Sequence, residues 1–204
     1  MTRDTIRVQD LPEKARMAAR KQLGHFEQQA APRGNRGLPF ERRIQAEFSV
    51  WEAAGIAHLA RMPVPTAPAP RPGDPMRRVA TGTAPFDLYG WTMVHWHPNI
   101  RAAGMCIGAE LKTTYKKRPS LAIAEKSGLR LHQLDALAAL AHAGGVARLV
   151  WENGNEVGVL YNAAILEAHE RFYEGGRGTR SIPWRLFEAV EEISVEGHRV
   201  LGWL

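Results

Sequence analysis

The sequence predicts an α/β or α+β fold in which helices pack on a mixed β-sheet. Apolar residues recur with helical spacing at 38–54 and 129–143, and two hairpin patterns lie at 86–114 and 146–161. With 204 residues, the chain is long enough for one well-buried domain, or for one domain with appendages. The order of the elements, from helix and strand through two hairpins to further helices, is typical of a mixed sheet covered by helices.

Residues 1–33 are a basic extension of the main domain, which covers 34–204. Ala, Lys, Arg, Gln and Glu dominate residues 11–31 and favour a helix, but apolar positions are sparse there. The basic residues of the extension are Arg3, Arg7, Lys14, Arg16, Arg20, Lys21 and Arg33. Two interpretations stay open: a solvated tail and an arm that binds nucleic acid.

An apolar stripe with helical spacing predicts the first helix of the main domain, over 38–54. The stripe consists of Phe40, Ile44, Phe48 and Trp51. The helix is expected to end at Gly55, and a strand over 56–62 follows. Glu41 lies at the edge of the stripe, where a first-turn glutamate usually faces solvent and interacts favourably with the helix dipole.

The segment 66–83 is rich in proline, so it cannot enter a central sheet. It carries Arg71, Arg77 and Arg78 against a single acidic residue, Asp74. The segment is too long for an ordinary connection, which marks it as functional or disordered. We expect a protruding stalk whose arginines contact phosphates.

The hairpin at 86–114 predicts the chemistry of the protein. If Pro98 and Asn99 are the central turn residues, paired positions sum to 197 and Asp87 lies opposite Glu110. Lys112 shares a sheet face with Glu110 because side chains alternate with period 2. Paired carboxylates suit Mg²⁺ or Mn²⁺, and a nearby lysine can hold a water beside the metal. The alternative is a surface hairpin with a Glu–Lys salt bridge, since the E-x-K pattern alone is weak.

The second half of the chain begins with a basic loop over 113–128, which carries Lys116, Lys117, Arg118 and Lys126. A leucine-rich helix over 129–143 is expected to stop at Gly144-Gly145. The second hairpin is expected to turn around Asn153-Gly154. Asn162 is predicted to cap a helix that runs to Tyr173, and Ser181 to cap a last helix that begins near Pro183.

Composition narrows the possible partners and location. A net charge of +6 and an isoelectric point near 9.8 favour a polyanionic partner. The single Cys106 cannot form an internal disulfide, which suits a reducing cytoplasm. No apolar run approaches a membrane span, and the N-terminus lacks a secretory signal, so we expect a cytoplasmic protein without a membrane partner. His95, His97 and Cys106 would make only three ligands of a structural zinc site, which needs four.

The hairpin and four further segments resemble a known family. Asp87 followed by Glu110-Leu111-Lys112 resembles the D…E-x-K core of PD-(D/E)xK nucleases, and within them the RecU-type Holliday junction resolvases. The other segments, in the family's order, are Asn35-Arg36-Gly37 with Phe40-Glu41 and Ile44, Pro63-Val64-Pro65, His132-Gln133 before Gly144-Gly145, and Arg180-Ser181-Ile182-Pro183. The resemblance covers about residues 34–190.

The resemblance implies a restriction-endonuclease-like fold, a homodimer and Mg²⁺-dependent cutting of four-way DNA junctions, with Mn²⁺ as a substitute and no small-molecule cofactor. Asp87, Glu110 and Glu41 would hold the metal, Lys112 would position the attacking water, and Gln133 would lie near the site. The expected DNA contacts are Arg36, Arg71, Arg77, Arg78, Lys116, Lys117 and Arg118. Two departures stand out: the hairpin is longer and the stalk shorter than the family pattern.

Two other functions remain open at this stage. The nuclease could act on duplex ends or flaps instead of junctions. Alternatively, the chain could be a recombination accessory that binds DNA without cutting it, although the intact Asp87, Glu110 and Lys112 argue against that reading.

Overall fold

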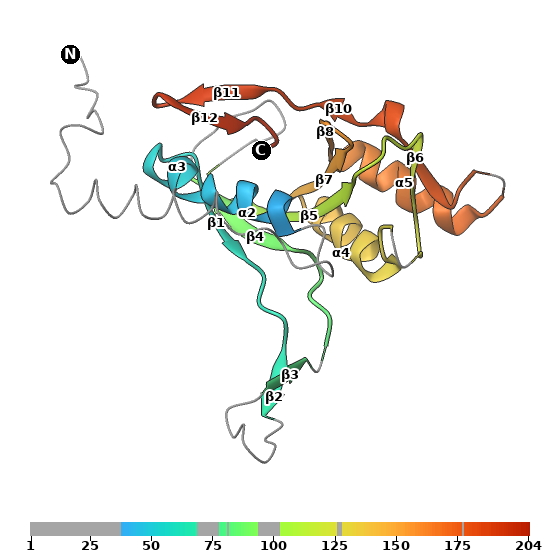
Figure 1. Ribbon diagram of the computed structural model, residues 1–204. Helices are drawn as coiled ribbons and strands as arrows, with labels where there is room; N and C mark the ends of the chain where they lie inside the picture. The colour runs from blue at the N-terminus through green and yellow to red at the C-terminus, as the bar shows by residue number, and fades with distance from the viewer. Residues whose placement is uncertain (1–37, 69–77, 81, 94–102, 126–127, 177) are drawn as a thin grey trace, which may run out of the picture.

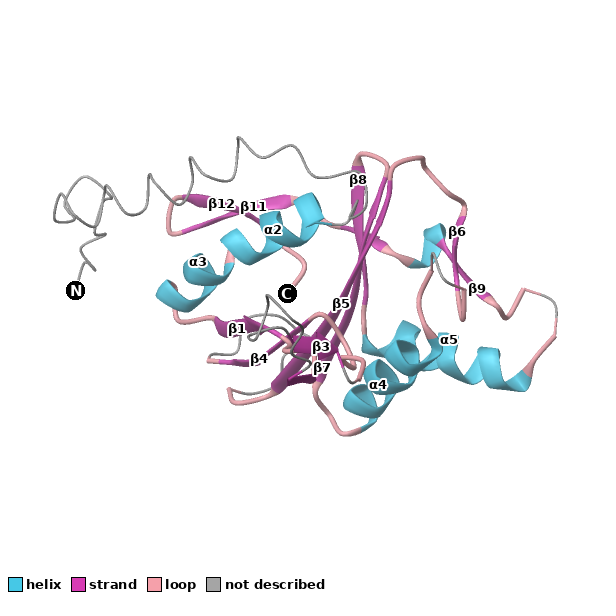
Figure 2. Cartoon of the chain, turned by 60° about the horizontal axis from the view of Figure 1, so that its bottom comes forward, coloured by secondary structure: helices cyan, strands magenta, loops and turns pink. Residues whose placement is uncertain are grey.

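The computed structural model describes residues 38–68, 78–80, 82–93, 103–125, 128–176 and 178–204. At its centre is a six-stranded sheet of order β1-β4-β5-β7-β8-β10. Its strands are β1 Ala57–Arg61, β4 Leu88–Thr92, β5 Cys106–Thr114, β7 Val146–Asn153, β8 Glu156–Leu160 and β10 Glu188–Ala189. Only β5 and β7 pair in parallel, so the sheet is mixed, as predicted. Helices flank this sheet on both faces (Figure 2).

Helices α2 (Leu38–Ala46) and α3 (Phe48–Ala53) cover one face of the sheet. The predicted stripe points inward: Phe40, Ile44 and Trp51 are all buried. The predicted single helix is wrong in one respect, because it breaks at Glu47. There the backbone tightens through hydrogen bonds from Glu47 N–H to Ile44 O (3.1 Å) and from Val50 N–H to Glu47 O (3.0 Å).

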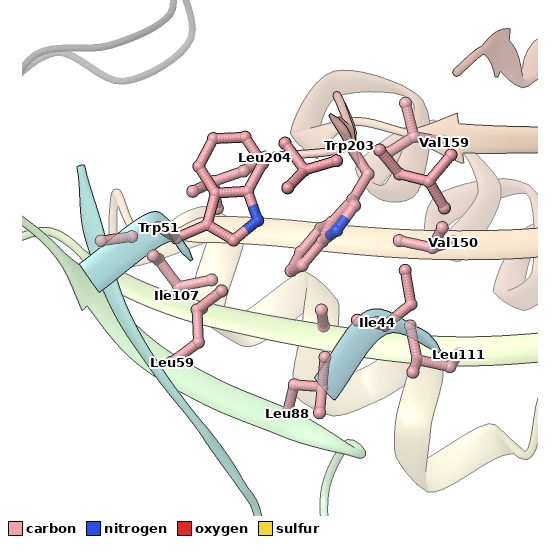
Figure 3. Packing of buried hydrophobic residues seen from close by; sticks show 14 of the residues in the cluster. Ile44, Trp51, Leu59, Leu88, Ile107, Leu111, Val150, Val159, Trp203 and Leu204 are labelled. Carbon is pink, nitrogen blue, oxygen red and sulfur yellow. The ribbon is translucent and has the colours of Figure 1, made fainter. Parts of the chain in front are cut away.

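The C-terminal segment adds a hairpin of β11 (Glu192–Val195) and β12 (His198–Leu201) to the same side. Trp203 and Leu204 follow it into the core, where they pack with Trp51 above the sheet residues (Figure 3). The predicted last helix near Pro183 is therefore wrong. Only the 3₁₀ turn η2 (Trp184–Leu186) forms, because the residues beyond it alternate with period 2, and Glu196 (φ 49°) and Gly197 (φ 83°) make a hairpin turn.

Ser181 does not cap a helix. It begins β9 (Ser181–Pro183), which pairs with β6 (Ser120–Ala122) in a small separate ladder.

The other sheet face is covered by α4 (Leu131–His142) and α5 (Asn162–Glu174). The buried face of α4 consists of Leu134, Leu137, Ala138 and Ala141, and the chain turns away at Gly144, whose φ of +81° suits glycine. Asn162 is the first residue of α5, not its cap. Its Oδ1 accepts a hydrogen bond from Ala147 N–H (3.0 Å), and its Nδ2 donates to Gly145 O (2.6 Å).

The β7–β8 hairpin turns one residue later than predicted. Asn153 still pairs with Glu156, which leaves Gly154 and Asn155 as the turn. Asn153 is buried, and its Oδ1 accepts hydrogen bonds from Thr114 Oγ1 (3.0 Å) and from the main-chain N–H of Arg118 (2.7 Å). This asparagine fixes the start of the basic loop to the sheet.

Strands β2 (Thr66–Pro68) and β3 (Arg78–Ala80) pair as a separate two-stranded ribbon that extends away from the central sheet (Figure 1). Neither β2 nor β3 joins the six-stranded sheet, and residues 69–77 and 81 of the expected stalk lie outside the described ranges. Arg71, Arg77 and the basic extension 1–33 lie outside the described residues.

Candidate functional site

The register of the β4–β5 hairpin is the one predicted. Leu88 pairs with Ala109, Tyr89 with Gly108 and Trp91 with Cys106, so each pair sums to 197. Continuing the register by one residue places Asp87 opposite Glu110. The Asp87 side chain is fixed there, because its Oδ2 accepts a hydrogen bond from Leu111 N–H (2.9 Å) on β5. The turn residues Pro98 and Asn99 are outside the described ranges.

Glu110 is a buried carboxylate on the α4 side of the sheet. Its neighbours Ala109 and Leu111 belong to the core that faces α2 and α3, so alternation turns Glu110 the other way. Only 1% of Glu110 is exposed. Its Oε1 lies 2.7 Å from Lys112 Nζ and accepts a hydrogen bond from Gln133 Nε2 (2.5 Å). Its Oε2 is also buried, and no hydrogen-bond donor among the described residues reaches it.

Burial raises the pKa of Glu110 to about 8. The Lys112 ammonium lowers this pKa, whereas the nearby Asp87 carboxylate raises it. Two carboxyl groups this close repel when both are ionised, so the site favours either a shared proton or a bound cation.

Gln133 orients the site from the first turn of α4. Its Oε1 accepts hydrogen bonds from Lys112 Nζ (3.1 Å) and from the main-chain N–H of Arg130 (3.0 Å), while its Nε2 donates to Glu110. The Arg130 contact is one half of a capping box, which is why a glutamine three residues into the helix is held in place. The structure thus brings together four of the five predicted site residues, with Asp87, Lys112 and Gln133 around Glu110.

Glu41 is the fifth predicted site residue, and it approaches from α2. Burial and the charge of Asp87 raise its pKa, while Arg61 and Lys112 lower it, so Glu41 shares the electrostatic environment of the carboxylate pair. Its Oε2 forms an ion pair with Arg61 NH2 (3.2 Å). Arg61 is exposed at the end of β1 and was missed by the sequence analysis. Arg61 pairs with Leu88, the residue after Asp87, and this β1–β4 pairing is the feature that would have pointed to Arg61.

The donor set fits a hard divalent cation. Within the described ranges, no three His, Cys, Asp or Glu side chains are arranged to hold a metal by themselves. Mg²⁺ is typically held by one or two carboxylates, with water and phosphate oxygens completing its shell. Asp87 and Glu110 provide such a pair, and the unsatisfied Oε2 of Glu110 offers a free ligand atom. His95 and His97 are not among the described residues, and Cys106 is exposed.

Four of the seven predicted DNA-contacting residues are described, and all four are exposed: Arg78, Lys116, Lys117 and Arg118. Arg78 braces the ribbon, because its Nε donates to Thr66 Oγ1 (2.8 Å) and its NH2 donates to Thr66 O (3.0 Å). Lys117 forms an ion pair with Glu156 (2.6 Å). Arg36, Arg71 and Arg77 lie outside the described part of the chain.

Across the part of the chain that is described, the helices are too short or too polar to cross a membrane. No protein-family model matches the sequence, and none of the curated proteins compared with it is similar.

Proposed function

We propose that this protein is a Mg²⁺-dependent endonuclease that resolves four-way DNA junctions by paired nicks in homologous recombination and repair. The observation that carries the proposal is the meeting of Asp87 and Glu110 beside Lys112 and Gln133 on one sheet face. A buried carboxylate with one unsatisfied oxygen, next to a second carboxylate, is a site prepared for a cation. The resemblance to RecU-type resolvases supports the choice of DNA as the polyanion.

Asp87 and Glu110 would hold the metal, with Glu41 reaching it directly or through water. When bound, Mg²⁺ would neutralise charge on the scissile phosphate and acidify a bound water. Lys112 would hold and orient the attacking water, and Gln133 would keep the Lys112 ammonium in place through its 3.1 Å hydrogen bond. Hydrolysis then forms one P–O bond from water and breaks the P–O bond to the leaving oxygen.

The choice of a four-way junction rests on the resemblance, which implies a symmetric homodimer whose two sites would nick two opposed strands. The ribbon of β2 and β3, with exposed Arg78, would enter the junction as the stalk. Because DNA is the substrate and Cys106 has no internal disulfide partner, we place the activity in the cytoplasm, on the nucleoid or on DNA in a host cell.

The experiment that tests the proposal compares a fluorescently labelled four-way junction with a linear duplex and a flap of the same sequence, each with Mg²⁺. Paired nicks in opposed strands of the junction are expected. Faster cleavage of the duplex or the flap than of the junction would show that the protein is a nuclease for duplex ends or flaps and not a junction resolvase. Binding without cleavage of any substrate would favour a non-catalytic DNA-binding accessory.

A matched control uses two carboxylate variants. Asp87→Asn keeps an acceptor for Leu111 N–H but removes the charge, and should lose cleavage. Glu167→Gln changes an exposed carboxylate on α5 that forms a long ion pair with Arg171 (3.8 Å). This variant should cut like the wild type.

A further inference from the structure

Two large aromatic side chains of β4 are exposed on the sheet face that carries the candidate site. Tyr89 is 37% exposed and Trp91 46%, although both lie within the central sheet. The His58 ring, from β1, stacks on Trp91 with 4.2 Å between ring centroids and 23° between the planes. We call Tyr89, Trp91 and His58 the aromatic strip.

The register places the aromatic strip on the face of Glu110. Leu88, Gly90 and Thr92 are buried on the α2–α3 side, so Tyr89 and Trp91 point to the opposite side. Tyr89 pairs with Gly108, which lies two residues before Glu110 and therefore on the same face of β5. Asp87, Tyr89 and Trp91 thus follow one another at every second position, which spaces them about 7 Å apart along the strand.

Helix α4 covers β5, and among the described residues no helix covers β4 and β1 on this face. A side chain at Gly108 would collide with Leu140 of α4, which shows how closely the helix packs over β5. Figure 2 shows β1 and β4 at the margin of the sheet, beyond α4. The aromatic strip therefore runs from the carboxylate pair out to the β1 edge of the sheet.

Bases of an unpaired DNA strand fit this strip better than a second copy of the chain does. A stable protein interface buries about 800 Å² per partner, whereas one large aromatic side chain supplies at most about 250 Å². Every base has a π-face, so aromatic rings bind single strands without sequence preference. The chain as a whole carries a net charge of +6, and Arg61, which pairs with Glu41, is exposed at the end of β1 nearest Asp87.

We propose that Tyr89 and Trp91 are a stacking platform for the bases of a single-stranded DNA segment next to the scissile phosphate. His58 backs the Trp91 ring, and Glu52 Oε1, 2.8 Å from His58 Nδ1, orients the imidazole. The platform rests on the proposed nuclease function and adds to it a substrate feature: unpaired bases beside the cut, as at a branch point.

The test measures binding of a thymidine 15-mer and of a fully paired duplex by fluorescence anisotropy in EDTA, so that no cleavage occurs. Trp91→Leu keeps apolar bulk but removes the ring, and should weaken binding of the 15-mer about 5- to 150-fold. Trp91→Phe keeps a ring and should bind nearly as well as the wild type. Duplex affinity and the salt dependence of binding should not change in either variant, because no charge is removed.

Tyr89→Leu should weaken single-strand binding in the same direction, and Tyr173→Leu is its matched control. Tyr173 is 58% exposed but lies on α5, away from β1 and β4. Circular dichroism establishes that each variant is folded. If Trp91→Leu does not fold, Tyr89→Leu decides the question.

The outcomes separate this platform from the function on which it rests. Folded leucine variants that bind the 15-mer like the wild type would overturn the platform and leave the nuclease in place. Trp91→Leu and Trp91→Phe that both dissociate a dimer in sedimentation would make the strip an interface between copies, which also overturns it. A wild-type protein that binds neither single-stranded nor branched DNA would refute the platform and the proposed function together.

Discussion

Replacing Glu47 with glutamine should remove a loss of stability that the wild type suffers as pH rises. Glu47 is 7% exposed at the break between α2 and α3, and its Oε1 accepts a hydrogen bond from Leu201 N–H (3.2 Å) of β12. Burial raises the pKa of Glu47 from 4.5 to about 7, although the Leu201 N–H and Arg43 both act to lower it. The folded protein therefore holds a proton that the unfolded chain releases at lower pH.

The sign follows from proton linkage. Where the folded state binds more protons than the unfolded state, the free energy of unfolding falls as pH rises. The penalty is absent below the unfolded pKa of 4.5, grows between 4.5 and about 7, and is complete above that. At about 1.4 kcal/mol per pKa unit, the loss between pH 5 and pH 8 is about 2 to 3 kcal/mol.

Urea unfolding of the wild type and Glu47→Gln at pH 5 and pH 8 measures this effect. The difference in unfolding free energy should move in favour of the variant by about 2 to 3 kcal/mol across that range. Glu191→Gln, an exposed change in the same C-terminal segment, should track the wild type. Parallel pH profiles for the wild type and Glu47→Gln would refute the electrostatic account of this buried carboxylate.

Two further predictions concern the site and the stalk. Lys112→Ala should slow cleavage but keep Mn²⁺ binding, measured by calorimetry, because the lysine contributes charge and hydrogen-bond donors and does not coordinate the metal. A variant that loses metal affinity but cleaves at the wild-type rate at saturating metal would contradict this role. Replacing Arg71, Arg77 and Arg78 together with alanine should weaken junction binding and flatten the plot of log K against log salt by roughly 2 to 3 units, because each arginine that neutralises a phosphate releases counterions. Cleavage of junction that is already bound should fall much less. An unchanged salt slope in a folded triple variant would mean that the segment 66–83 is only a solvated loop without a role in binding.

The sequence allowed the central hairpin to be predicted because its determinants are local. Strand alternation and an assumed turn at Pro98-Asn99 were sufficient to predict the register of the two strands, and the register puts Asp87 beside Glu110 and Lys112. The stripe of Phe40, Ile44 and Trp51 was equally readable, since helical spacing alone selects the buried side.

The errors arose where tertiary contacts override local signals. Asn162 is a typical capping residue, but its side chain is used to hold Gly145 and Ala147. Glu47 interrupts a helix and contacts Leu201, 154 positions later, which no local pattern reveals. Ser181 followed by Pro183 suggested the start of a helix, but residues 181–183 instead pair with β6 as the short strand β9. The alternation beyond it and the Glu196-Gly197 turn were the missed signals of a hairpin.

The aromatic strip shows a different limit of sequence reasoning. Tyr89 and Trp91 alternate with buried residues, which predicts that they share a face but not whether a helix covers it. That depends on where α4 crosses the sheet, and only the folded chain shows that α4 lies to one side of β1 and β4 and that Tyr89 and Trp91 are exposed.

The most direct test of the central claim is the cleavage of a four-way junction by Asp87→Ala and Glu110→Ala with saturating Mg²⁺. Removing either carboxylate removes a ligand of the proposed metal, and with it the Lewis acid and its bound water. Cleavage should fall to the background rate, while folding and junction binding stay close to those of the wild type. Wild-type cleavage rates from folded Asp87→Ala would contradict the proposed metal site and the nuclease function built on it.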